Sequence, residues 1–146
     1  MTSPTKTHPA MTPEDMTALY ARCFPDRPWD ESEITTLLNR ADVISVITDY
    51  GFVLASCIAP EAEILTIAVS PDHRRQGIAS GLFRTLWSNF STRGIDTVFL
   101  EVASGNSAAM ELYKSFDFQE VGRRKGYYTR INAPAEDAVV MRCALT

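Results

Sequence analysis

The chain has 146 residues, of which 45% are apolar and 22% are charged. This length and composition are typical of one globular domain, and they exclude extended disorder except at the ends. Fourteen basic and eighteen acidic residues give a net charge of −4, which disfavours direct binding to nucleic acid.

Three cysteines at wide spacings, without a C-x-x-C pair, favour neither a disulfide framework nor a zinc site. The chain holds two histidines, so we also expect no metal. The first twenty residues lack the apolar segment of a signal peptide, and no apolar run approaches the ~20 residues of a membrane span. We therefore expect a cytoplasmic protein that does not enter a membrane.

Two capped helices are expected in the first forty residues. Thr12 can cap a helix that starts at Pro13, and Asp15 can return a hydrogen bond to the cap. Asp30 and Glu33 repeat this pattern before a second apolar stripe. We expect residues 1–11 to be partly flexible, with at most a short edge strand near residues 5–10.

The rest of the chain alternates between strand and helix patterns. Strands are expected at 42–49, 51–59, 64–69, 97–102, 118–121 and 138–144. The first two of these form a hairpin at Tyr50-Gly51. Amphipathic helices are expected at 77–90 and 107–116. The sequence therefore predicts one α/β domain over residues 1–146, built on a mixed sheet.

A polar loop between the strand at 64–69 and the helix at 77–90 predicts an anion site. Gly77 lets a ligand approach the backbone, and the free N–H groups at a helix start attract negative charge. Arg74 and Arg75 add positive charge, and Ser80 adds a hydroxyl. Neither G-x-G-x-x-G nor G-x-x-x-x-G-K-[ST] is present, which disfavours nicotinamide cofactors and nucleoside triphosphates. A capped helix with surface arginines is the alternative interpretation.

The pattern Arg74-x-x-Gly77-x-Ala79 resembles the [Q/R]-x-x-G-x-[G/A] loop of the GNAT acetyltransferases, which holds the pyrophosphate of acetyl-CoA. Residues 100–118 resemble the L-E-V-x-x-x-N-x-x-A-x-x-L-Y-x-x-x-G-F run of N-terminal protein acetyltransferases. Residues 24–29 resemble the F-P-W segment of that group, and residues 136–141 resemble its closing strand. From about Thr12 to its end, the chain resembles the RimI-type ribosomal-protein-alanine N-acetyltransferases.

The resemblance implies a GNAT fold, with a mixed but mostly antiparallel sheet of six to seven strands and about four flanking helices. It also implies acetyl-CoA as co-substrate, held at a strand that splays from its neighbour, at the anion loop and at the start of the next helix. The implied residues are Ile67, Ala68, Val69, Arg74, Arg75, Gln76, Gly77, Ile78, Ala79, Ser80 and Asn106.

Two catalytic roles follow from the resemblance. It makes Glu101 the general base, although a strand-end carboxylate in water is the common alternative. It makes Tyr113 the general acid, although a core tyrosine is the usual reading of an inward phenol. A phenol can protonate a thiolate at a cost of only ~2 kcal/mol. Asn106 is equally well explained as a helix cap.

The basic run 123–126 precedes Tyr127 and Tyr128, in the region where the family has a loop lining the peptide groove. Both tyrosines are therefore candidate substrate contacts, although most such runs are solvated loops. Two positions depart from the family pattern. Asp117 replaces the usual glycine and suggests a different turn, and Ala103 replaces a frequent arginine.

The function implied is transfer of acetyl from acetyl-CoA to the N-terminal amine of a small-subunit ribosomal protein, by direct attack in a ternary complex. An α-amine is about 3.5 kcal/mol easier to deprotonate than a lysine, which suits a single carboxylate base. Acetylation of a lysine or a small amine remains an alternative within the same class. A non-catalytic acyl-CoA-binding partner protein is an alternative of another class.

Overall fold

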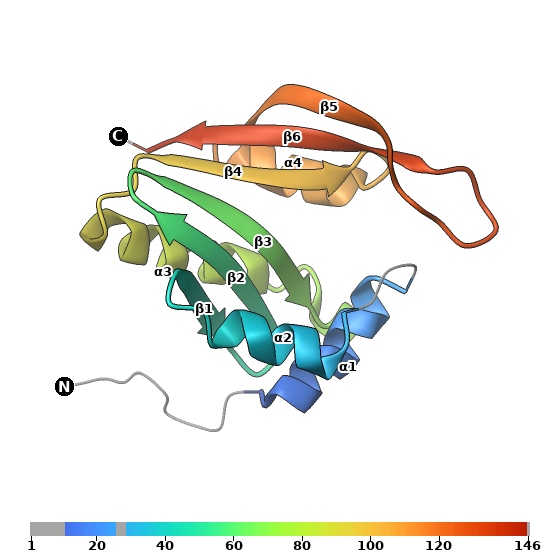
Figure 1. Cartoon of the computed structure of the whole chain (residues 1–146), viewed down its shortest axis with the longest axis horizontal. Coiled ribbons are helices and arrows are strands. Elements are labelled where there is room, and N and C mark those ends of the chain that lie inside the picture. The colour runs from blue at the N-terminus through green and yellow to red at the C-terminus, as the bar shows by residue number, and fades with distance from the viewer. Residues whose placement is uncertain (1–10, 26–28, 146) are drawn as a thin grey trace.

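The computed structural model describes residues 11–25 and 29–145, and within them six strands form one sheet in the order β1-β2-β3-β4-β6-β5 (Figure 1). Their bounds are β1 Val43–Ile47, β2 Gly51–Ile58, β3 Glu61–Val69, β4 Thr97–Ala103, β5 Gln119–Tyr128 and β6 Glu136–Ala144. Every neighbouring pair is antiparallel except β3 and β4. The expected mixed, mostly antiparallel sheet is confirmed. The edge strand expected near residues 5–10 lies outside the described residues.

Four α-helices accompany the sheet in this part of the chain: α1 Pro13–Cys23, α2 Glu31–Leu38, α3 Ile78–Thr92 and α4 Ser107–Ser115. The two expected capping boxes are present. The Asp15 amide donates to Thr12 Oγ1 at 3.1 Å, and the Glu33 amide donates to Asp30 Oδ1 at 2.8 Å. Each cap satisfies helix-end donors that would otherwise be unpaired. None of these helices is long and apolar enough to cross a membrane.

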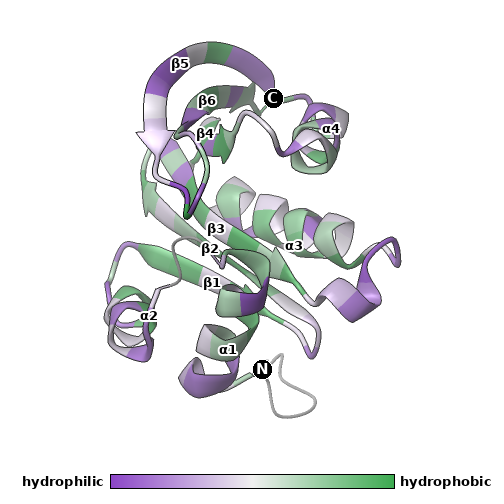
Figure 2. Cartoon of the chain, turned by 90° about the vertical axis from the view of Figure 1, so that its right-hand side faces the viewer, coloured by the Kyte–Doolittle hydropathy of each residue, from purple (hydrophilic) through white to green (hydrophobic). Residues whose placement is uncertain are grey.

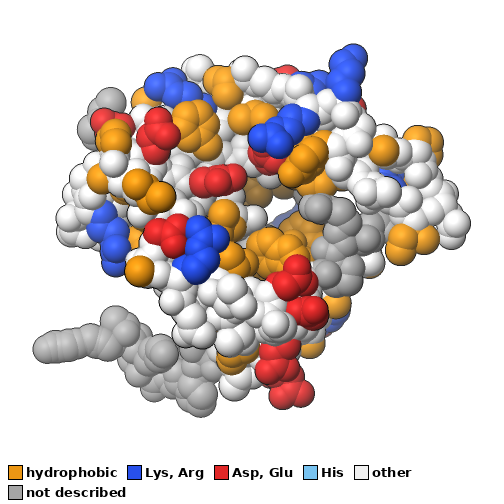
Figure 3. Space-filling model, viewed as in Figure 1, with side chains coloured by type: hydrophobic (Ala, Val, Ile, Leu, Met, Phe, Trp, Pro, Cys, Tyr) orange, Lys and Arg blue, Asp and Glu red, His pale blue; other side chains and the backbone are white. Residues whose placement is uncertain are grey.

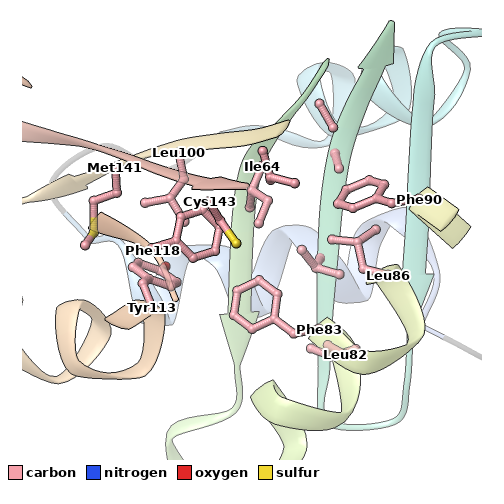
Figure 4. Close-up of a cluster of buried hydrophobic side chains, with 14 of the residues drawn as sticks. Ile64, Leu82, Phe83, Leu86, Phe90, Leu100, Tyr113, Phe118, Met141 and Cys143 are labelled. Atoms are coloured by element: carbon pink, nitrogen blue, oxygen red, sulfur yellow. The ribbon is translucent and has the colours of Figure 1, made fainter. Parts of the chain in front are cut away.

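The helices cover both faces of the sheet. Figure 2 shows α1 and α2 on one side and α3 and α4 on the other. Met16, Leu19, Tyr20 and Ile34 of the first pair pack against Phe52 and Leu54. On the opposite face, α3 and α4 build a larger core whose side chains point at the strands (Figure 4): Leu82, Phe83, Leu86, Phe90 and Tyr113, against Ile64, Leu100, Phe118 and Met141. The first five residues of β2 are therefore buried on both faces, whereas β3 and β4 alternate between buried residues and partly or fully exposed ones.

The strands β3 and β4 separate after a short paired segment. Their parallel pairing covers only residues 61–63 against 97–99, and Figure 1 shows the two strands diverging beyond it. The register between β2 and β3 shifts where Leu54 pairs with Thr66 but Ala55 pairs with Ile64, which marks a bulge at Leu65. The expected splay is confirmed. Parallel strands end at the same edge of a sheet, so the splay opens toward the starts of α3 and α4.

The structure corrects the expected boundaries at the C-terminal end. Residues 123–128 belong to β5 and not to a loop, because the strand continues to Tyr128. Its pairing with β6 skips from Arg124–Ala138 to Tyr128–Glu136, so three residues of β5 lie opposite Asp137 alone. A polar edge strand exposed on both faces lacks the apolar alternation by which strands are recognised.

Asp117 adopts the left-handed conformation that glycine favours, with φ of 69°. The Phe118 amide donates to the Tyr113 carbonyl at 3.1 Å and the Asp117 amide to the Lys114 carbonyl at 3.0 Å. This hydrogen-bond pair is the Schellman motif that ends many helices with glycine. The expected change of turn at this position is therefore wrong, because the aspartate takes the conformation suited to the family's glycine.

Candidate active site

A cavity of about 300 Å³ lies where β3 and β4 separate. It is lined from both sides of the splay by Tyr20, Trp29, Leu37, Glu63, Ile64, Leu65, Glu101, Tyr127 and Tyr128. Figure 3 shows this face hollowed near its middle, with hydrophobic side chains around the hollow and acidic ones close to it. Aromatic walls and two carboxylates suit a ligand that is partly apolar and carries a positive charge.

Glu101 lies on β4 with its side chain only 20% exposed. Its Oε2 forms an ion pair with Arg124, whose Nε lies 2.9 Å away, and the Arg124 guanidinium lies 5.1 Å from the centre of the Tyr127 ring. The carboxylate thus faces the cavity and not bulk water. An incoming ammonium would have to share this carboxylate with Arg124 or displace it.

Tyr113 is 7% exposed and lies in the larger core, against Phe83 and Phe118. Burial raises the pKa of Tyr113 well above its usual range, and the nearby phenol of Tyr128 raises the pKa further. The hydroxyl therefore stays protonated at neutral pH and can act as a donor. The same shift makes proton release costlier than for a free tyrosine.

The α3 N-terminus provides three backbone donors in a row. Gly77 is the cap residue, with φ of 77°, and it has no side chain to accept from them. Among the described residues, no acceptor is found for the amides of 78, 79 and 80. A Cβ at Gly77 would meet no protein atom within 4 Å, so the space beside it is open. Unpaired amides at an exposed helix start fit a phosphate group.

The other anion-loop residues have different surroundings. Arg74, Arg75 and Gln76 are exposed, and Arg75 has a φ of 64°. Arg74 Nη2 lies 3.8 Å from Cys23 Sγ on α1. The loop thus contacts α1 of the opposite helix layer, while both arginine side chains remain exposed. Together the two arginines supply the positive charge expected for a diphosphate.

Ile67, Ala68 and Val69 lie on the unpaired half of β3, beyond its last contact with β4. They pair with β2 on the opposite side, at Val53, Phe52 and Gly51. Asn106 caps α4, and its Oδ1 accepts from the Ala109 amide at 3.2 Å. The helix-cap interpretation of Asn106 is therefore confirmed.

Several residues of this site were not predicted from the sequence. Tyr20, Trp29 and Glu63 line the cavity, and Arg124 pairs with Glu101. Trp29 belongs to the F-P-W-like segment, which is the sequence feature that points to it. Arg124 belongs to the basic run, but nothing in that run indicates its pairing with Glu101. The described residues contain no group of three or more His, Cys, Asp or Glu side chains placed to hold a metal.

Comparison with known proteins gives consistent matches. The profile of the Acetyltransferase (GNAT) family matches residues 14–118. The ribosomal protein bS18-alanine N-acetyltransferase of Escherichia coli K12 is 33% identical over 118 residues, which cover 78% of this chain and 79% of the relative. The N-alpha-acetyltransferase RimI of Mycobacterium tuberculosis is 43% identical over 82 residues, covering 56% of this chain and 48% of the relative.

Solved structures match over almost the whole chain. The crystal structure of the ribosomal-protein-S18-alanine N-acetyltransferase from Escherichia coli superposes with a TM-score of 0.80 at 28% identity, covering 94% of this chain and 92% of that one. Arabidopsis thaliana NAA60 in complex with acetyl-CoA shares the fold, with a TM-score of 0.78 at 23% identity over 90% of this chain and 92% of that one.

Proposed function

Since the chain belongs to the GNAT acetyltransferase family, we propose that it acetylates the N-terminal amine of a ribosomal protein, with acetyl-CoA as co-substrate. The E. coli relative named for alanine of ribosomal protein bS18 supports the choice of an N-terminal alanine on a small-subunit protein. The observation that carries the proposal is the cavity at the splay, which holds Glu101 between aromatic walls. Three free cysteines and a ribosomal substrate agree with a cytoplasmic location.

In this proposal, bound acetyl-CoA extends from the α3 N-terminus to the cavity. The amides of 78–80, with Arg74 and Arg75, bind the diphosphate. Gln76 lies in the same loop, and Ala79 and Ser80 belong to the first turn behind it. The pantetheine arm lies along Ile67–Val69, whose backbone groups on the β4 side are free of that strand. Asn106, at the start of α4, borders the same opening.

Transfer then needs three proton movements. Glu101 removes a proton from the substrate ammonium, directly or through a water. The neutral amine attacks the thioester carbonyl, and backbone N–H groups near Ile67–Val69 stabilise the oxyanion. The carbon–sulfur bond breaks, Tyr113 donates its proton to the departing thiolate, and the second proton of the attacking nitrogen passes through solvent to the resulting tyrosinate. No covalent enzyme intermediate is needed, so both substrates are bound together.

A substrate panel tests the proposal. Purified protein and acetyl-CoA are incubated with peptides that begin with alanine, with N-terminally blocked peptides containing lysine, and with polyamines. We expect preference for the free N-terminus. Strong preference for lysine or polyamines would overturn the substrate assignment in favour of a small-amine or lysine acetyltransferase.

Two variants test the catalytic assignment. Glu101→Gln and Tyr113→Phe should each lower kcat on the order of 100-fold or more, while CoA affinity measured by calorimetry stays near that of the wild type. If neither substitution changed acetyl transfer, these roles would be wrong. If the wild type bound CoA but acetylated nothing, a non-catalytic acyl-CoA-binding protein would be the better description.

A further inference from the structure

Two neighbouring carboxylates at the start of β6 have no chemical role in the reaction above, yet each accepts a hydrogen bond from a glycine amide beside the site. These residues are Glu136 and Asp137. Successive side chains of a strand point to opposite faces. The two carboxylates can therefore hold two different segments from adjacent positions of one strand.

Glu136 holds the turn between β4 and α4. Its Oε2 accepts from the Gly105 amide at 2.8 Å, and its side chain is 23% exposed. Gly105 immediately precedes Asn106, the cap of the helix that carries Tyr113. A Cβ on Gly105 would collide with the Glu136 carboxylate, so the absence of a side chain there permits this contact.

Asp137 holds the irregular part of β5. Its Oδ1 accepts from the Gly126 amide at 2.9 Å, and Arg123 Nη1 lies 3.5 Å from its Oδ2. The Gly126 amide is also the largest cause of the lowered pKa of Asp137. Gly126 has a φ of 60° and lies in the three-residue bulge opposite Asp137. Arg124 and Tyr127, which border Glu101 and the cavity, flank this glycine.

We propose that Glu136 and Asp137 are positioning residues that set the two sides of the active site separately. Glu136 fixes the β4–α4 turn, and with it Asn106 on the acetyl-CoA side. Asp137 fixes the β5 bulge, and with it Tyr127 on the peptide side. The inference rests on the proposed function, because it assigns the two sides to the two substrates.

Steady-state kinetics with both substrates varied tests this division. Asp137→Ala should raise KM for the peptide on the order of tenfold and leave KM for acetyl-CoA within about twofold. Glu136→Ala should raise KM for acetyl-CoA on the order of tenfold and leave KM for the peptide within about twofold. Asp137→Asn and Glu136→Gln keep a carbonyl oxygen that can accept from the same amide, so each should restore most of the loss.

Two further variants separate positioning from general destabilisation. Gly105→Ala displaces the Glu136 carboxylate without removing it, so it should reproduce the Glu136→Ala kinetics even if that variant folds poorly. Glu120 also pairs with Arg123, at 3.5 Å, but it contacts neither segment. Glu120→Gln is therefore the matched control, and both KM values should stay within about twofold of the wild type, as expected for an exposed ion pair.

Amide hydrogen exchange provides a readout that does not depend on acetyl transfer. Asp137→Ala should accelerate exchange at the Gly126 amide, and Glu136→Ala should accelerate it at Gly105, each without affecting the other. The proposal is supported if each variant raises the KM of one substrate only and accelerates exchange at one glycine amide only. Equal effects of both variants on one KM, or unchanged exchange at both glycines, would overturn it. If the variants showed this exchange pattern but the wild type had no activity on N-terminal peptides, the proposed function alone would be overturned.

Discussion

Tyr113 shows how the surroundings of one side chain set its chemistry. Its phenol is packed against Phe83 and Phe118, and burial raises its pKa. In the unfolded chain a tyrosine ionises near pH ~10. Between that value and the raised folded value, the native state holds one more proton than the unfolded state. The free energy of unfolding must therefore fall as the pH rises through that window.

This linkage predicts the behaviour of Tyr113→Phe in alkali. The wild type should lose about 1 kcal/mol more stability than the variant between pH 10 and pH 11, because only the wild type gains from ionising this phenol on unfolding. Urea unfolding at pH 8, 10 and 11 measures the difference. Parallel losses in the two proteins would show that the hydroxyl is not held neutral by the fold.

Glu101 shows the limit of sequence reasoning about single residues. A carboxylate in an apolar strand was identifiable, and its place in the resembled motif gave it a role. The contacts of its side chain were not identifiable, because Arg124 and Tyr127 come from a strand that pairs with β6 and not with β4. Tyr20 and Trp29 reach the same cavity from the opposite helix layer. Only tertiary packing brings these residues together.

At the scale of elements, the helices were predictable because their signals are local. Thr12 with Asp15 and Asp30 with Glu33 lie within one turn of each other, so the caps could be read directly. The end of β5 could not be predicted, because Asp137 holds it from another strand. The anion loop was found because its glycine and arginines are neighbours in sequence.

The two ends of α3 offer a matched test of that loop. Gly77 and Gly94 both have positive φ, 77° and 74°, and a Cβ at either would meet no protein atom within 4 Å. Gly77→Val and Gly94→Val should therefore lose similar stability, on the order of 1–2 kcal/mol. Calorimetry should show weaker CoA binding for Gly77→Val only, because its side chain would fill the space beside the free amides. Wild-type affinity in Gly77→Val would contradict the loop assignment.

The end of α4 permits a stabilising change. Asp117 is held at a φ of 69°, where glycine has no steric penalty. Asp117→Gly should raise the free energy of unfolding by about 0.5–1 kcal/mol, the relief of left-handed strain less the added entropy of the unfolded chain. Urea denaturation measures this change, with Asp117→Ala as the control that keeps the strain. If Asp117→Gly were no more stable than Asp117→Ala, the backbone at this turn would be unstrained.

At the scale of the whole molecule, ligand binding should stabilise the fold by mass action. Free CoA at 100 times its Kd adds about 2.7 kcal/mol. For a domain of this size, that corresponds to a rise in Tm of roughly 8 °C. Thermal melts of the wild type with increasing CoA measure it, and Gly77→Val should show a much smaller rise at the same concentrations. An equal rise in both proteins would place the nucleotide elsewhere.

The seam between β3 and β4 has a consequence for how the products leave. Only three positions pair β3 with β4, and all three lie at the beginning of the two strands. A ligand bound in the open end, as proposed above, contacts β3 on one side and β4 on the other. The spent coenzyme can therefore leave from this open end without breaking any backbone pairing between the two strands.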